Sequence, residues 1–168
     1  MSDLSYLRGY SEGLLEQIQA LIDKDKLGQF ILNKYPHAHD LKSDKALYDL
    51  AVGLKKAYLK SSGPLSKVLY DNKISLKQQA LGLHSFVSRV QGKKLKAKNE
   101  IRIASVLKKV PLEFMRVILV HELAHLKEKE HNKAFYKLCK HMEPGYFQLE
   151  FDLRVYLTYH EMKGSLYL

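Results

Sequence analysis

Residues 119–132 read LVHELAHLKEKEHN, and the predicted fold depends on the HExxH pattern at positions 121–125. His121 and His125 are four residues apart, so both imidazole rings lie on one face of a helix and can bind the same metal ion. Glu122 is rotated away from that face but stays beside it, where its carboxylate can take a proton from water activated by the metal. The pattern therefore predicts a metal-dependent hydrolase with Glu122 as the catalytic acid/base.

His131 is the predicted third metal ligand, because a catalytic zinc ion usually has three protein ligands and one open position. Six residues turn a helix by about 600°, so His131 would point away from His125 if the helix continued. We therefore expect the helix to end after about Leu126 and the chain to fold back, with Asn132 starting the next helix. Metzincin peptidases share this spacing, but they have a glycine where this chain has Glu128.

Three features of this site stay open at the level of sequence. A carboxylate, Glu143 or Glu150, could close the site in place of His131. Three imidazoles favour one zinc ion, although other divalent transition metals such as nickel, cobalt and copper also bind such a set. Candidates for stabilising the transition state, chosen by their proximity in sequence, are Tyr136, His141, Tyr146 and Arg154.

Hydrophobic periodicity predicts an α+β fold, in which a small antiparallel sheet packs on the HExxH helix and further helices surround it. The predicted helices span 11–22, 43–59, 111–126, 132–142 and 146–160. The predicted strands span 67–70, 73–76, 83–90 and 100–106, and the first two form a hairpin across Asp71 and Asn72. A turn-forming cluster at 61–64 divides one predicted domain, 1–168, into a helical part, 1–62, and a part with the sheet and the HExxH helices, 63–168.

The composition sets limits on partners and compartment. The chain has 28 Lys and Arg residues against 18 Asp and Glu, a formal net charge of +10, which favours acidic partners such as nucleotides or nucleic acid. Its single cysteine, Cys139, cannot form an internal disulfide. No signal peptide is evident, and the longest apolar run, Val117–Val120, is too short to span a membrane. We therefore expect a soluble, cytoplasmic protein with no membrane partner.

Two stretches carry a resemblance to a known family. They are LHSFVSRVQGKKLKAKNEIRIA at 83–104 and VHELAHLKEKEHNKAFYKLCKHMEPGYFQLEFDLRVYL at 120–157. The chain resembles the YgjP-like (DUF45-type) zinc metallopeptidases, a minimal zincin group, and the resemblance extends over its whole length to the short bacterial members. It implies a zincin-like fold, zinc ligands at His121, His125 and His131, and the general base at Glu122.

The main functional prediction is a metallopeptidase. In that interpretation an extended peptide adds to the edge of the sheet beside the HExxH helix, in the manner of β-strand addition. The metal polarises the peptide carbonyl, and Glu122 delivers the water and then passes its proton to the leaving amine.

Two alternatives remain open. The first is a metal-dependent nucleoside triphosphate pyrophosphohydrolase, in which a basic hairpin that includes Arg89, Lys94 and Arg102 binds the triphosphate. No P-loop or other glycine-rich phosphate-binding loop is visible, which counts against it. The second alternative is a nucleic-acid-associated protease similar to the SprT-like zincins, in which the same basic residues contact the phosphate backbone.

Overall fold

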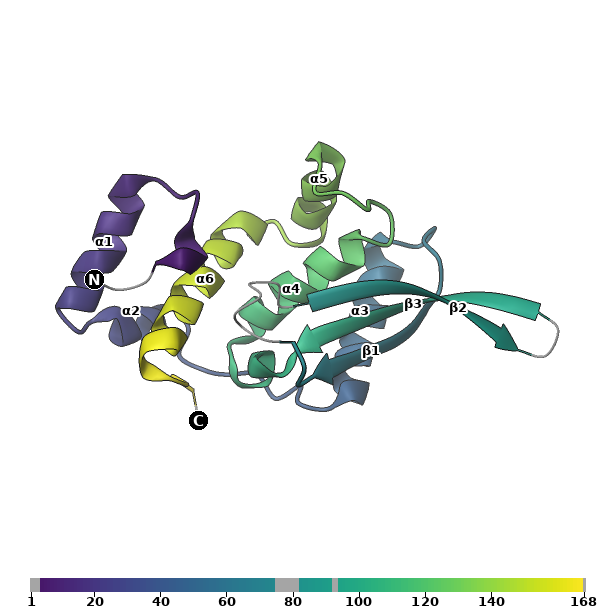
Figure 1. The fold of residues 1–168 in the computed structure, drawn as a ribbon, viewed down its shortest axis with the longest axis horizontal. Coiled ribbons are helices and arrows are strands. Elements are labelled where there is room, and N and C mark those ends of the chain that lie inside the picture. The colour runs from purple at the N-terminus through teal and green to yellow at the C-terminus, as the bar shows by residue number, and fades with distance from the viewer. Residues whose placement is uncertain (1–3, 75–81, 92–93, 168) are drawn as a thin grey trace.

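The computed structural model describes residues 4–74, 82–91 and 94–167, with side chains described throughout except at 83–98. Its elements are the 3-10 helices η1 (Ser5–Leu7) and η3 (Ser105–Lys109), the helices α1 (Glu12–Asp23), α2 (Leu27–Lys34), α3 (Asp44–Tyr58), α4 (Leu112–Ala124), α5 (Lys133–Met142) and α6 (Tyr146–Lys163), and the strands β1 (Leu65–Asp71), β2 (Gly82–Gln91) and β3 (Lys94–Ala104). The fold is a mostly helical α+β arrangement with one small sheet, as predicted (Figure 1).

Side-chain caps explain where three of the helices begin. The Ser11 hydroxyl accepts a hydrogen bond from the backbone N–H of Leu14 at the start of α1. Ser43 caps α3 in the same way, and the Asn132 carboxamide caps α5. All five predicted helices are present, and α2 is an additional helix around the short apolar segment that ends before Pro36. None of the helices in the described part of the chain has the length and apolar character needed to cross a membrane.

The sheet differs from the prediction, because it is mixed and not antiparallel. Its strand order is β1-β3-β2, with β1 parallel to β3 and β2 antiparallel to β3. The predicted hairpin of 67–70 with 73–76 is wrong for the described residues, since Lys73 and Ile74 are not in a strand; residues 75–76 lie outside the described part of the chain. The predicted strands at 83–90 and 100–106 correspond to β2 and β3, although β3 starts and ends earlier.

The physical reason for this difference lies at Asp71. Its carboxylate accepts a hydrogen bond from the backbone N–H of Lys73, which turns the chain out of the sheet at the end of β1. The strand therefore finds its partner in the distant β3, with Asp71 aligned to Ala104. Alternation of apolar residues indicates a strand but does not identify its partner, so parallel pairing was not predicted.

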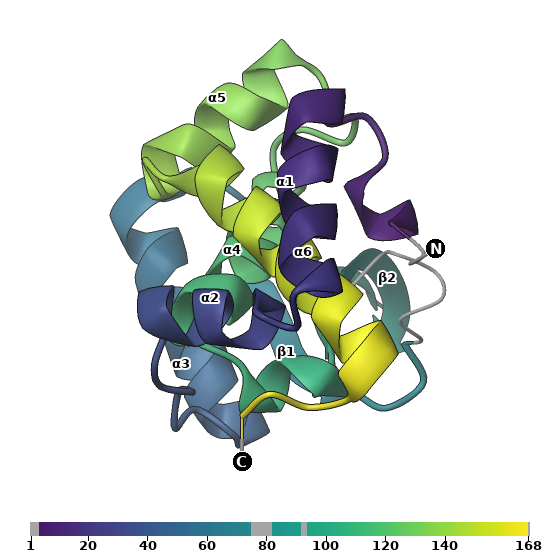
Figure 2. The ribbon, with the colours of Figure 1, turned by 90° about the vertical axis from the view of Figure 1, so that its left-hand side faces the viewer.

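Helix α4 occupies the centre of the molecule. It lies between α6 and the sheet, as Figure 1 and the perpendicular view in Figure 2 both show. It is buried almost all round, through Phe114, Met115, Val117, Leu119, Val120, Leu123 and Ala124. Packing on several sides fixes the orientation of this helix, and so fixes the side chains at its carboxyl end.

Candidate metal centre

The three histidines of the motif come together at the carboxyl end of α4. Each of His121, His125 and His131 offers one ring nitrogen, and these three atoms all lie within 4.8 Å of one another. The Nε2 atoms of His125 and His131 are 3.2 Å apart. Two nitrogens bound tetrahedrally to one zinc ion, each at about 2.05 Å, would be separated by about 3.3 Å. The donor set and its spacing therefore fit a divalent transition metal ion.

The turn that brings His131 back to the helix follows the predicted course. Helix α4 ends at Ala124, and His125 is its C-cap. The backbone N–H of Glu128 donates to the carbonyl of Ala124, which closes one further turn before the chain reverses. Asn132 then caps α5, immediately after His131. Because both ends of this connection are held by hydrogen bonds, His131 is placed opposite the two helical histidines.

The ring nitrogens that point away from the cluster have partners of their own. Nδ1 of His125 lies 2.9 Å from the backbone carbonyl of Glu128, and since a carbonyl only accepts, the ring donates its proton there. Nδ1 of His121 lies 2.8 Å from the hydroxyl of Tyr146 on α6. Such outer contacts fix the ring orientation and leave Nε2 of His125 with a lone pair for a metal. Glu128 uses its backbone here, so no glycine is required at that position.

A buried aromatic ring packs against all three histidines of the cluster. Phe135 on α5 is fully buried, and its ring centroid lies 4.8 Å from that of His121, 4.7 Å from that of His125 and 5.0 Å from that of His131. The burial of His121, followed by the nearby charges of His125, His131 and Arg154, lowers its pKa to about 3. Its ring therefore stays neutral at physiological pH, as a metal ligand must.

The side chain of Glu122 is buried on the face of α4 that packs against β2. Only 6% of it is exposed, and burial raises the pKa of its carboxyl to about 7. A Cβ atom on Gly82 would lie 2.7 Å from Cγ of Glu122, which is closer than two carbon atoms can approach. Only glycine at 82 lets the strand pass so near this carboxylate. Gly82 was not predicted to belong to the site, because a lone glycine before a strand has no distinctive signal in the sequence.

The structure does not bring Arg102 to the histidine cluster. Gly82 pairs with Ile103, so Ile103 points to the same side of the sheet as Glu122 and α4. Arg102 is next to Ile103 and points to the other side, where its guanidinium lies 3.3 Å from the carboxylate of Asp71. The side chains of Arg89 and Lys94, also predicted to bind substrate, lie outside the described residues.

Some of the remaining candidate residues lie at the histidine cluster, and others do not. Tyr146 contacts His121 directly, and the ring of Tyr136 lies beside that of His131, tilted and with 6.4 Å between the ring centroids. His141 is exposed and packs against Tyr58 instead. Glu150 does not close the cluster, since in the described residues the group that could hold a metal consists of the three histidines alone.

Comparison with known proteins gives two results. The YgjP-like metallopeptidase domain matches residues 34–156. The chain is also 58% identical, over 158 residues, to a protein named UTP pyrophosphatase from Escherichia coli (strain K12), and the match covers 94% of this chain and 95% of that protein. No solved structure matches the chain.

The name of this relative corrects the main functional prediction. A metallopeptidase was expected, but a relative this similar over nearly its full length is named for hydrolysis of a nucleotide. The peptidase prediction is therefore wrong, and the pyrophosphohydrolase alternative agrees better with the comparison. Both names describe hydrolases, and a possible metal site is present, as the HExxH pattern indicated. The predicted resemblance is confirmed: this chain belongs to the YgjP-like family.

Proposed function

We propose that this chain is a metal-dependent nucleoside triphosphate pyrophosphohydrolase. The observation that carries the proposal is its 58% identity, over 94% of its length, to a UTP pyrophosphatase. The clustered histidines support it, because His121, His125 and His131 would hold one zinc ion and leave a position open for water and substrate. A uridine or other nucleoside triphosphate is the proposed substrate.

The chemistry needs a base beside the metal and an activated phosphorus. A zinc ion at the cluster would lower the pKa of a water molecule and offset negative charge on the phosphoryl oxygens. Glu122 accepts the proton that the attacking water loses; burial raises the pKa of its carboxyl in the metal-free protein, and a nearby dication would keep the carboxylate ionised and able to act as the base. The water oxygen bonds to the α-phosphorus and the P–O bond to the β-phosphate breaks. The products are a nucleoside monophosphate and pyrophosphate.

Tyr146 and Gly82 would act indirectly. Tyr146 orients the ring of His121 through its hydroxyl, and Gly82 leaves room for the carboxylate of Glu122 between α4 and β2. Neither side chain needs to touch the substrate for this role. Preorganised ligands and a fixed base are the features that lower the barrier in a site of this kind.

The test compares the wild type with Glu122→Gln. Both proteins are analysed for bound metal, then assayed against a panel of nucleoside triphosphates with separate detection of pyrophosphate and orthophosphate. We expect one metal ion in each protein, pyrophosphate release by the wild type, and a rate about 10²–10⁴-fold lower in the variant, the usual range for loss of a general base. His37→Ala, which changes an exposed histidine away from the cluster, is the matched control.

Two results would contradict the proposal. A wild-type protein that holds its metal and hydrolyses no nucleoside triphosphate would exclude this substrate class. Equal rates for the wild type and Glu122→Gln would exclude Glu122 as the base.

A further inference from the structure

Two aromatic side chains form an accessible surface next to the histidine cluster. Tyr136 on α5 is partly buried, and its ring centroid lies 6.4 Å from that of His131. Phe147 is in the first turn of α6, and its ring centroid lies 5.5 Å from that of Tyr136. Phe147 is 50% exposed, the highest value among the large apolar residues in the described part of the chain. We call Tyr136 and Phe147 the aromatic platform.

The aromatic platform lies beside the histidine that is most open to solvent. His131 is exposed, whereas His121 and His125 are partly buried. The fully buried ring of Phe135 packs against all three histidines and covers the inner side of the cluster. The cluster is therefore open to solvent on the side of His131, and accessible rings continue from this histidine through Tyr136 to the other member of the platform.

Regular structure fixes the positions of both rings. Helix α5 begins two residues after His131 and is capped by Asn132, so Tyr136 is held in its first turn. Phe147 follows Tyr146, whose hydroxyl contacts His121, and the centroids of these two neighbouring rings are 5.4 Å apart. Side chains on helices keep a more precise geometry than side chains on loops. The platform therefore has a defined position relative to the cluster.

Exposure alone does not mark Phe147 as a binding residue, because single exposed apolar side chains are normal. Phe30 on α2, which is 43% exposed, is an example. Phe147 differs because Tyr136 extends its surface and because Nζ of Lys140 lies 6.0 Å from its ring centroid. None of the described carboxylates forms an ion pair with Lys140. The platform therefore suits a planar ring that is attached to an anionic group.

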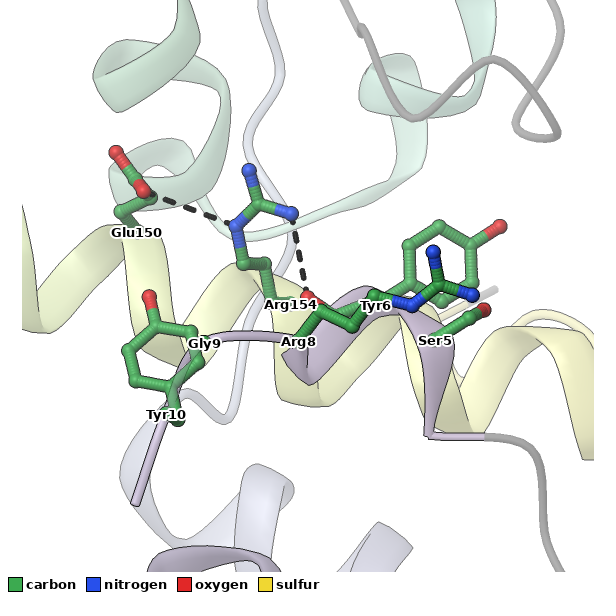
Figure 3. Close-up of a pocket in the computed structure, with 7 residues that line it drawn as sticks. All are labelled: Ser5, Tyr6, Arg8, Gly9, Tyr10, Glu150 and Arg154. Carbon is green, nitrogen blue, oxygen red and sulfur yellow. Dashed lines mark hydrogen bonds and ion pairs between the residues drawn. The ribbon is translucent and has the colours of Figure 1, made fainter.

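Further along α6, by contrast, the polar side chains are engaged within the protein. Arg154 is about two helical turns beyond Tyr146. Its Nε lies 3.7 Å from Oε1 of Glu150, and its Nη1 donates to the backbone carbonyl of Tyr6 at 3.2 Å, beside the pocket that Figure 3 shows. These contacts hold the N-terminal segment against α6. The first turn of α6, which carries Phe147, is the part of the helix that adjoins the cluster.

We propose that the aromatic platform binds the nucleobase of the nucleoside triphosphate, which stacks on Phe147 while the α-phosphate reacts at the histidine cluster. Aromatic side chains bind many nucleobases in this way, because every base has a π-face. The ring of Tyr136 separates Phe147 from His131, and the ribose separates a base from its α-phosphate, so one nucleotide spans both sites. This inference rests on the proposed function, because it assigns another part of the same substrate.

The test measures binding of uridine monophosphate to the zinc-loaded protein by NMR. Stacking on an aromatic ring moves the signals of the uracil protons upfield, so we expect an upfield shift with the wild type. Phe147→Leu keeps an apolar side chain but removes the ring. In this variant the shift should decrease and the dissociation constant should rise about fivefold to a hundredfold, as for loss of a base–aromatic stack. Phe30→Leu, which changes an exposed ring on α2, is the matched control and should behave as the wild type.

A ligand without a base makes the test specific. Ribose phosphate keeps the sugar and the phosphate, so its dissociation constant should be the same for the wild type and Phe147→Leu. The assignment is overturned if both proteins bind uridine monophosphate equally well, if the wild type gives no upfield shift, or if ribose phosphate loses as much affinity as the nucleotide. A changed oligomeric state of Phe147→Leu with unchanged nucleotide binding would instead assign this ring to a contact between two copies of the chain.

The release of pyrophosphate separates this inference from the proposed function. If the wild type releases pyrophosphate from UTP but its binding of uridine monophosphate does not depend on Phe147, the function stands and the platform is not the base site. If the base stacks on Phe147 but no nucleoside triphosphate is hydrolysed, the platform stands and the proposed function is contradicted.

Discussion

Helices α4 and α6 lie side by side and carry different parts of the site. Helix α4 is buried almost all round and ends in the histidine cluster, so its functional residues are close in sequence. Helix α6 carries a row of polar side chains, from Tyr146 to Arg154, that contacts His121 at one end and the N-terminal segment at the other. The comparison teaches that the proposed metal site is formed by residues close in sequence, whereas the contacts that surround it depend on how distant segments meet.

The largest expected effect comes from removing a ligand on α4. In His121→Ala the cluster retains two imidazoles, so we expect loss of the bound metal and a fall in pyrophosphate release of at least about 10³-fold, which corresponds to several kcal/mol of transition-state stabilisation. Metal analysis and the rate assay check this prediction together. A variant that keeps full metal content would show that His121 is not a ligand.

The second prediction concerns the buried carboxylate on α4. Burial raises the folded-state pKa of Glu122 from 4.5 to about 7, so its ionisation destabilises the folded protein; this penalty is absent below pH 4.5 and complete above pH 7. In the metal-free protein, the unfolding free energy of Glu122→Gln minus that of the wild type should therefore be about 3 kcal/mol larger at pH 8 than at pH 4.5.

Urea unfolding at the two pH values measures this difference. His121 has a lowered pKa and acts in the opposite sense, since stability falls as pH drops from 6.5 towards 3, but it is common to both proteins and cancels. A pH-independent difference between the two proteins would contradict the buried position of Glu122.

The third prediction addresses the contact between the two helices. Tyr146→Phe removes the hydroxyl that holds Nδ1 of His121 but keeps the buried ring, so we expect metal affinity to fall about 10–100-fold, as for loss of other outer partners of metal ligands. Competition with a chelator measures it. Tyr48→Phe, which removes a hydroxyl that donates to the backbone carbonyl of Leu65, is the matched control.

The smallest effect is expected on the sheet. Arg102 points away from α4 and pairs with Asp71 across a partly exposed surface, so Arg102→Ala should cost less than about 1 kcal/mol of stability. The Michaelis constant for the nucleotide should stay within about twofold of the wild-type value, because this side chain does not face the histidine cluster. A tenfold rise in the Michaelis constant would contradict this prediction and would support binding of the triphosphate by the basic strands.

Local features explain what the sequence could predict. The caps at Ser11, Ser43 and Asn132 act within three residues, so helix starts follow directly from residue type and spacing. The same holds for the histidine cluster, whose members lie within eleven consecutive residues. Their roles as ligands, and the single-domain organisation, stay predictions.

Non-local features explain what it could not. The pairing of β1 with β3 joins segments more than thirty residues apart, and the approach of Gly82 to Glu122 joins segments forty residues apart. Periodicity identifies faces of elements but does not determine which faces meet. The direction of Arg102 belongs to the same class, because the side of the sheet to which it points depends on the pairing of distant strands.

The most direct test of the central claim is hydrolysis of UTP by the metal-loaded wild type in water enriched in ¹⁸O, with mass analysis of both products. We predict that one ¹⁸O atom appears in the nucleoside monophosphate and none in the pyrophosphate, because water attacks the α-phosphorus. Label in pyrophosphate or orthophosphate, or no hydrolysis at all, would contradict the proposed reaction.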